Sequence, residues 1–112
     1  TLACHRGHRG DFEPLAEVGA KDITAHVDWP GIALAAQEAG LSVAGYTSQA
    51  RFLLNAGLGA LLDAASPRDR ADALKLVHEH EMGELFKVMA LASPGLDATL
   101  SGFASGDRTH RL

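Results

Sequence analysis

The side chains best suited to chemistry lie in a short segment where polar and apolar residues alternate. Residues 22–29 alternate over eight positions, and the polar members are Asp22, Thr24, His26 and Asp28. Such alternation predicts an extended segment with one face on the core and the other toward water or a cleft. His26 beside Asp28 would form an oriented general base, and a carboxylate there would bind a guanidinium.

A structural interpretation of the same residues requires fewer assumptions about them. Asp28 can cap the helix that follows while His26 bonds to a loop, and capping requires only Asp28. We prefer this interpretation, but the segment remains the best site candidate in the chain. His26 and Asp28 are therefore the catalytic candidates, and Thr24 and Asp22 are candidates for binding substrate.

Two further groups of residues resemble metal ligands. Cys4, His5 and His8 lack the second ligand pair that a structural zinc site uses, so we expect no metal there. His5 and His8 stay as substrate-binding candidates on a loop that touches substrate or orders a sheet edge. His78 and His80 would lie about 200° apart around a helix and could not share an ion.

Glu84 and Lys87 flank a short apolar run, residues 86–92, whose length predicts a buried strand. Glu84 is a further substrate-binding candidate because it could reach a cleft. The alternative, which we prefer, is that both residues are the solvated ends of that strand.

The elements that must position these residues follow an α/β order. We expect a helix from the Asp28 cap to Gly40, because Pro30 suits a first turn and Gly40 suits the position after a helix. The other expected elements, in chain order, are a short apolar piece at 1–4, a loop at 5–21, a strand at 41–47, a helix at 49–64, a helix at 67–80, the strand at 86–92 and a loop or weak edge at 93–112.

Composition narrows the class of protein. The chain has 112 residues, 46% of them apolar and 21% charged, with a net charge of −4. These values are typical of globular proteins, and the arginines are too scattered to form a basic surface for nucleic acid. No apolar run is long enough to span a membrane, and a single cysteine excludes an intrachain disulfide. Much of the apolar content is Ala, which predicts a thin core that packs against something else.

Several stretches together resemble one family. The stretches are Thr1–His8 (T-L-A-C-H-R-G-H), Asp22–Trp29 (D-I-T-A-H-V-D-W), Gly45–Leu54 (G-Y-T-S-Q-A-R-F-L-L), Met82–Met89 (M-G-E-L-F-K-V-M), Gly102-Phe103 and Asp107–His110. In this order and with short gaps, they resemble the C-terminal part of MidA-type methyltransferases, which depend on S-adenosylmethionine (SAM).

The resemblance implies an α/β fold: the C-terminal portion of a class I, Rossmann-like methyltransferase with a helical insertion before the last strand. It implies that residues 1–112 form a single domain, part of a methyltransferase domain whose N-terminal SAM-binding half is absent. No stretch here matches the glycine-rich SAM loop, so we expect no cofactor-binding residue and no bound cofactor in this chain. The longer enzyme would use SAM, and the isolated chain would be inactive.

The resemblance also implies partners. Eukaryotic members of the family are mitochondrial and methylate an arginine of a respiratory complex I subunit, so we expect a protein substrate. The expected location is the bacterial cytoplasm, or the mitochondrial matrix in a eukaryote. We expect no nucleic acid and no membrane as partners, and unpaired strand edges favour self-association. The alternative is a non-enzymatic α/β interaction domain that self-associates or completes a partner's sheet.

Overall fold

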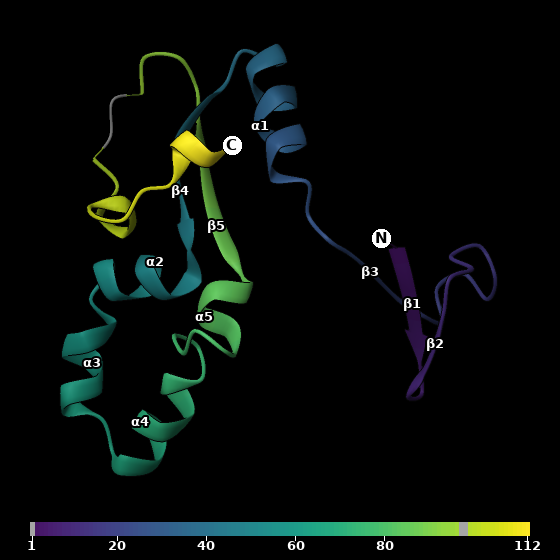
Figure 1. Cartoon of the computed structure of the whole chain (residues 1–112), viewed down its shortest axis with the longest axis horizontal. Helices are drawn as coiled ribbons and strands as arrows, with labels where there is room; N and C mark the ends of the chain where they lie inside the picture. Colours follow the sequence, from purple (N-terminus) through teal and green to yellow (C-terminus); the bar gives the residue numbers. More distant parts are fainter. Residues whose placement is uncertain (1, 97–98) are drawn as a thin grey trace.

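The computed structural model describes residues 2–96 and 99–112, which form two antiparallel sheets with helices between and around them (Figure 1). Thr1, the first residue of the resemblance, lies outside the described residues. The elements in chain order are β1 (Leu2–Arg6), β2 (Arg9–Asp11), β3 (Asp22–Ala25), α1 (Trp29–Glu38), β4 (Ser42–Ser48), α2 (Gln49–Asn55), α3 (Leu58–Ala64), α4 (Pro67–Leu74), α5 (Met82–Leu85), β5 (Lys87–Ala92) and the 3₁₀ helices η1 (Ser101–Phe103) and η2 (Thr109–Arg111).

The N-terminal sheet has the order β2-β1-β3 and is antiparallel throughout. The prediction of a loop over residues 5–21 is wrong for the end of β1 and for β2. A two-residue turn joins these strands, with φ of 53° at Gly7 and 65° at His8. Positive φ at both central residues is the geometry of tight hairpins, and glycine and histidine tolerate it better than most residues.

The extended segment predicted at 22–29 is only half present. β3 ends at Ala25, and residues 26–28 are irregular backbone leading into α1. The expected half-buried character is also wrong, because every residue of β3 is exposed and Ile23 is 57% accessible. The polar and apolar residues of β3 alternate, but none of the described elements buries either face of this strand.

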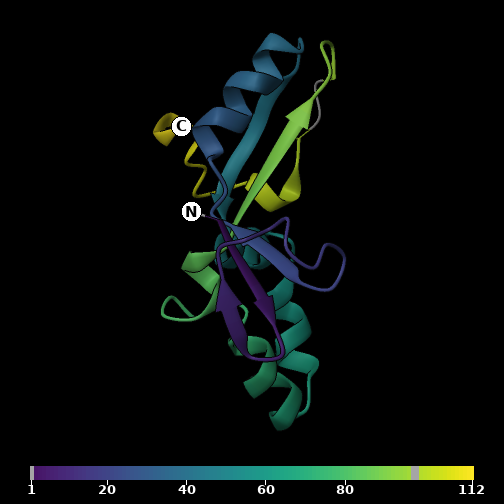
Figure 2. The ribbon, with the colours of Figure 1, turned by 90° about the vertical axis from the view of Figure 1, so that its right-hand side faces the viewer.

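The second sheet pairs β4 with β5 in antiparallel register, from Ser42 opposite Ala92 to Ser48 opposite Lys87. Both strands confirm their predictions to within a residue. The helices α2, α3, α4 and α5 all lie between them in the chain, as a helical insertion before the last strand. α1 packs on β4, as Figure 2 shows.

Two helix predictions were too long. The helix expected at 49–64 divides into α2 and α3 because Gly57 has a φ of 102°, which a helix cannot accommodate. The helix expected to reach His80 ends at Leu74, although its start is as predicted: Ser66 accepts a hydrogen bond from the backbone N–H of Asp69.

The C-terminal segment is fixed to the free edge of β4. The backbone N–H of Tyr46 donates to Asp107 Oδ1 (2.9 Å), and the Tyr46 carbonyl accepts from the Arg108 N–H (2.7 Å). Thr47, which is fully buried, donates its hydroxyl to the Gly106 carbonyl. The tail thereby occupies hydrogen-bonding groups that an added strand would use.

Packing is sparse for a chain of this size. The radius of gyration is 17.5 Å, against roughly 13 Å for a compact domain of this length. The accessible surface is 8003 Å², against roughly 5,900 Å² for a compact monomer of this mass. In Figure 1 the N-terminal sheet is set apart from the rest, joined through residues 26–28. The surplus surface agrees with the expectation of a thin core that packs against something else.

None of the described helices is both long and apolar enough to cross a bilayer.

Candidate functional site

An open groove of about 470 Å³ lies beside the end of β4. One wall is the segment 25–29, and the other is the segment 85–87, where α5 passes into β5. Because β4 and β5 are antiparallel, the last residue of β4 and the first residue of β5 meet at one edge of the sheet. The groove therefore lies at the end of this sheet where β4 finishes and β5 starts.

The walls of the groove combine apolar and titratable side chains. Trp29 and Phe86 supply aromatic surface from opposite sides, and His26 and Lys87 supply the polar groups. Trp29 is oriented by Tyr46 on β4, whose ring centroid lies 5.4 Å from its own. A site of this kind suits an amphipathic ligand, for which apolar walls provide area and a few polar groups fix orientation.

Glu84 lies next to this groove, but its carboxylate is already engaged. Arg108 donates two hydrogen bonds to it, at 2.7 and 2.9 Å, in the bidentate arrangement that favours strong pairing. These bonds hold the pKa of Glu84 at about 2, below its ordinary value of 4.5. Lys87 Nζ donates to the Glu84 carbonyl and lies 3.9 Å from its carboxylate.

The Glu84–Arg108 pair makes stability depend on acidity. Since the pKa of Glu84 is lower in the folded chain than in the unfolded one, its contribution is full above about pH 4.5 and is lost as the pH falls toward 2. The Glu84 side chain is 41% exposed, so we expect only about 1 kcal/mol. Urea unfolding of the unmodified chain and Glu84→Gln should differ by this amount at pH 6 and converge near pH 2–3. Glu38→Gln, which changes an exposed acid on α1, should follow the unmodified chain at each pH.

Asp28, the second catalytic candidate, caps α1. Its Oδ1 accepts a hydrogen bond from the backbone N–H of Gly31 at 3.1 Å, as the structural interpretation of this residue expects.

Two substitutions separate capping from acid–base chemistry at Asp28. Asp28→Ala should lower the free energy of unfolding by about 1 kcal/mol, and Asp28→Asn should lower it by a few tenths at most, because asparagine caps as well as aspartate. Thermal unfolding measures both. Equal losses in the two variants would contradict the capping role.

The remaining candidates lie on the N-terminal sheet. Thr24 donates its hydroxyl to the Ala3 carbonyl at 3.3 Å, and Asp22 is paired with His5 across β3 and β1. His8 lies in the exposed hairpin turn. Thr24 and His26 together line a second groove, of about 280 Å³, which also includes Phe12. His26 thus borders both grooves, whereas His5 and His8 line neither of them.

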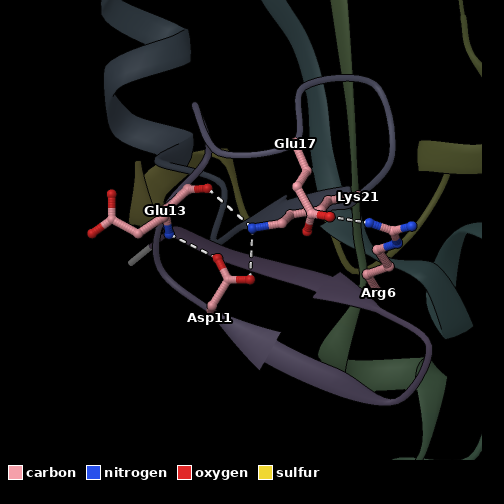
Figure 3. A network of polar contacts seen from close by, with 5 residues as sticks. All are labelled: Arg6, Asp11, Glu13, Glu17 and Lys21. Atoms are coloured by element: carbon pink, nitrogen blue, oxygen red, sulfur yellow. Dashed lines mark hydrogen bonds and ion pairs between the residues drawn. The ribbon is translucent and has the colours of Figure 1, made fainter.

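Ion pairs brace the loop that follows β2 (Figure 3). Lys21 Nζ donates to Asp11 Oδ2 at 2.7 Å, and Asp11 Oδ1 accepts from the Glu13 backbone N–H at 2.9 Å. Arg6 pairs with Glu17 across the same loop. The hydrogen bond from Lys21 is the main reason that the pKa of Asp11 is lowered. All these polar groups have protein partners, so we give them a structural role.

The sequence did not indicate the importance of Lys87 and Trp29, which line the groove, or of Arg108, which binds Glu84 beside it. Lys87 was considered only as a solvated strand end, and Arg108 only as part of the family-like tail. No local pattern pairs Arg108 with Glu84, because the two are 24 positions apart in the chain. Over residues 2–96 and 99–112, no three histidine, cysteine or acidic side chains gather where they could hold a metal ion.

Comparisons with known proteins agree with this architecture. Residues 1–47 match the model of a family described as "Putative S-adenosyl-L-methionine-dependent methyltransferase". The whole chain is similar to a COG1565 superfamily protein from Burkholderia thailandensis, solved bound to S-adenosyl-homocysteine, with 49% identity and a TM-score of 0.82. A second, native structure of a COG1565 superfamily protein from that organism gives the same identity and TM-score. No curated protein matches the chain.

The chain spans 30% and 32% of the lengths of these two structures, while 100% of it is covered. It therefore has the fold of one segment of these COG1565 superfamily structures, the first of which is described as a likely methyl transferase. The predicted α/β class, with a helical insertion before the last strand, is confirmed.

Proposed function

We propose that this chain is the C-terminal part of a MidA-type SAM-dependent methyltransferase and forms the acceptor side of its active site. The observation that carries the proposal is the groove between residues 25–29 and 85–87 at the carboxyl end of β4. Methyl transfer from a sulfonium needs alignment of acceptor and donor more than acid–base help. A groove with aromatic walls and few titratable groups meets that need.

The cofactor would be held outside these residues. A SAM loop must follow a strand and open a helix, so that backbone N–H groups meet the ligand. Gly7 and Gly10 belong to a β-hairpin, and Gly57 divides two short helices. The bound S-adenosyl-homocysteine of the Burkholderia thailandensis protein supports SAM as the cofactor of the longer enzyme.

The acceptor that we propose is an arginine side chain of a protein, as the family resemblance implies, with a respiratory complex I subunit as the substrate. Trp29 offers an aromatic face that attracts a guanidinium. Because Asp28 caps α1 and Glu84 is bound to Arg108, the carboxylate that orients the guanidinium would be Asp22 or a residue outside this chain.

A chimera tests the proposal. The segment of the Burkholderia thailandensis protein that matches this chain is replaced by the chain, and the chimera is incubated with methyl-labelled SAM and proteins of a bacterial lysate. We expect label in methylarginine after hydrolysis, reduced by Trp29→Ala within the groove. Label in another amino acid would contradict arginine as the acceptor, and transfer by the parent protein but not by the chimera would contradict the enzymatic role.

The alternative, a non-enzymatic interaction domain, is favoured by one observation: the surplus exposed surface. Among the described residues β5 pairs only with β4, so its apolar outer edge is open to a second copy. We propose that the isolated chain self-associates through this edge. Sedimentation should show a dimer whose fraction falls in Val88→Lys or on dilution, and a monomer at every concentration would contradict it.

A further inference from the structure

Beside the groove, one acidic side chain lies close to two basic side chains. The single carboxylate of Glu84 faces two cations, because Arg108 binds both of its oxygens and Lys87 lies 3.9 Å from one of them. Arg108 donates a hydrogen bond to each oxygen of the Glu84 carboxylate and is its main partner. Lys87 Nζ donates to the Glu84 carbonyl and lies 3.9 Å from a carboxylate that Arg108 already binds, so the three side chains together carry one net positive charge at the wall of the groove.

Apolar surface surrounds this charge. Leu85 is 71% exposed, Phe86 46% and, on the opposite wall, Val27 49%. The Lys87 side chain is only 21% exposed, so its ammonium group is partly shielded from water, which strengthens its attraction to an anion. Lys87 opens β5, and the paired strand fixes its backbone.

We propose that the groove binds an extended peptide segment that carries a carboxylate side chain between apolar residues, with Lys87 as the residue that selects the carboxylate. Apolar neighbours of the acidic residue would cover Leu85, Phe86 and Val27. The inference rests on the proposed function in one respect: the peptide would belong to the protein that is methylated. A polyanion such as nucleic acid is the poorer occupant, because the chain is acidic and this cation is single.

Binding of two matched peptides to the full chain, without SAM, tests the inference. One short peptide has Glu between leucines, and the other has Gln in its place. In NMR titrations of the ¹⁵N-labelled chain, the Glu peptide should bind about fivefold more tightly, equivalent to about 1 kcal/mol for a partly exposed ion pair. The shifted signals should lie in 25–29 and 85–87.

Substitutions test whether Lys87 causes the difference in affinity between the two peptides. Lys87→Gln should make the two peptides bind equally, and Lys87→Arg should retain the preference. Lys75→Gln removes the same charge at a site away from the groove and should leave the preference unchanged. The β4–β5 amide signals report whether each variant keeps the sheet.

Three results would overturn the inference: equal affinity of both peptides for the unmodified chain, no saturable binding of either, or an equal effect of Lys75→Gln and Lys87→Gln. The no-binding result would indicate that another part of the longer protein occupies the groove. Because SAM is absent from the experiment, these results are independent of whether the chimera transfers methyl groups.

Discussion

Gly83→Ala should lower the free energy of unfolding by about 2–3 kcal/mol, the largest effect that we expect of a single methyl group in this chain. Gly83 is buried in the short helix α5, directly before Glu84. A β-carbon there would overlap the backbone carbonyl of Val77 and crowd that of His78. Backbone atoms cannot rotate away as a side chain can, so α5 must move.

Thermal unfolding checks this prediction, because a loss of that size should lower the midpoint by about 10 °C or more. The matched control is Gly59→Ala in α3, where a β-carbon would meet open space. That variant should be at least as stable as the unmodified chain, since alanine is the better helix former and Gly59 is the second residue of α3. Similar midpoints for the two variants would contradict the packing described around Gly83.

Phe103→Ala should cost about 2 kcal/mol and loosen the C-terminal segment. The Phe103 ring packs edge-on against Phe52 of α2, with centroids 5.3 Å apart, and lies against Gly45 of β4 where no side chain intervenes. Fully buried phenylalanines cost about 3–5 kcal/mol when truncated, and Phe103 is partly exposed.

Two measurements distinguish this effect from a general loss of stability. Hydrogen exchange at the Tyr46 amide, which donates to Asp107, should become faster in Phe103→Ala while amides of α1 are unchanged. The pKa of Glu84, read by NMR, should rise from about 2 toward 4.5 as Arg108 is released. Phe103→Leu should retain most of both properties. A Glu84 pKa that stays near 2 in Phe103→Ala would show that the tail is held without Phe103.

Local signals in the sequence were sufficient for much of the fold. The Asp28 and Ser66 caps and the strands β4 and β5 were predicted because each depends on neighbouring residues or a continuous apolar run. The break at Gly57 was underestimated. Glycine can occupy a helix at modest cost, and the residues around Gly57 did not indicate that it would adopt a φ of 102°.

The candidate site was less predictable. Alternation at 22–29 indicated a strand facing a core, but its burial depends on layers that residues 2–96 and 99–112 do not supply to β3. Glu84 lies in the helical insertion and Arg108 in the C-terminal segment, and no spacing in the sequence predicts that they pair. His26 was predicted because it belongs to the alternating segment 22–29 and lies beside Asp28, whereas Lys87 needed the geometry of the groove.

The central claim, that this chain forms the acceptor side of a methyltransferase while the cofactor binds elsewhere, is tested most directly by thermal unfolding with and without SAM. A ligand that binds only the folded state raises the midpoint, by the equivalent of about 2.7 kcal/mol at a hundredfold excess over Kd. We predict a shift for the chimera with the Burkholderia thailandensis protein and none for the isolated chain. A clear shift in the isolated chain would place the SAM site within these 112 residues and contradict the account.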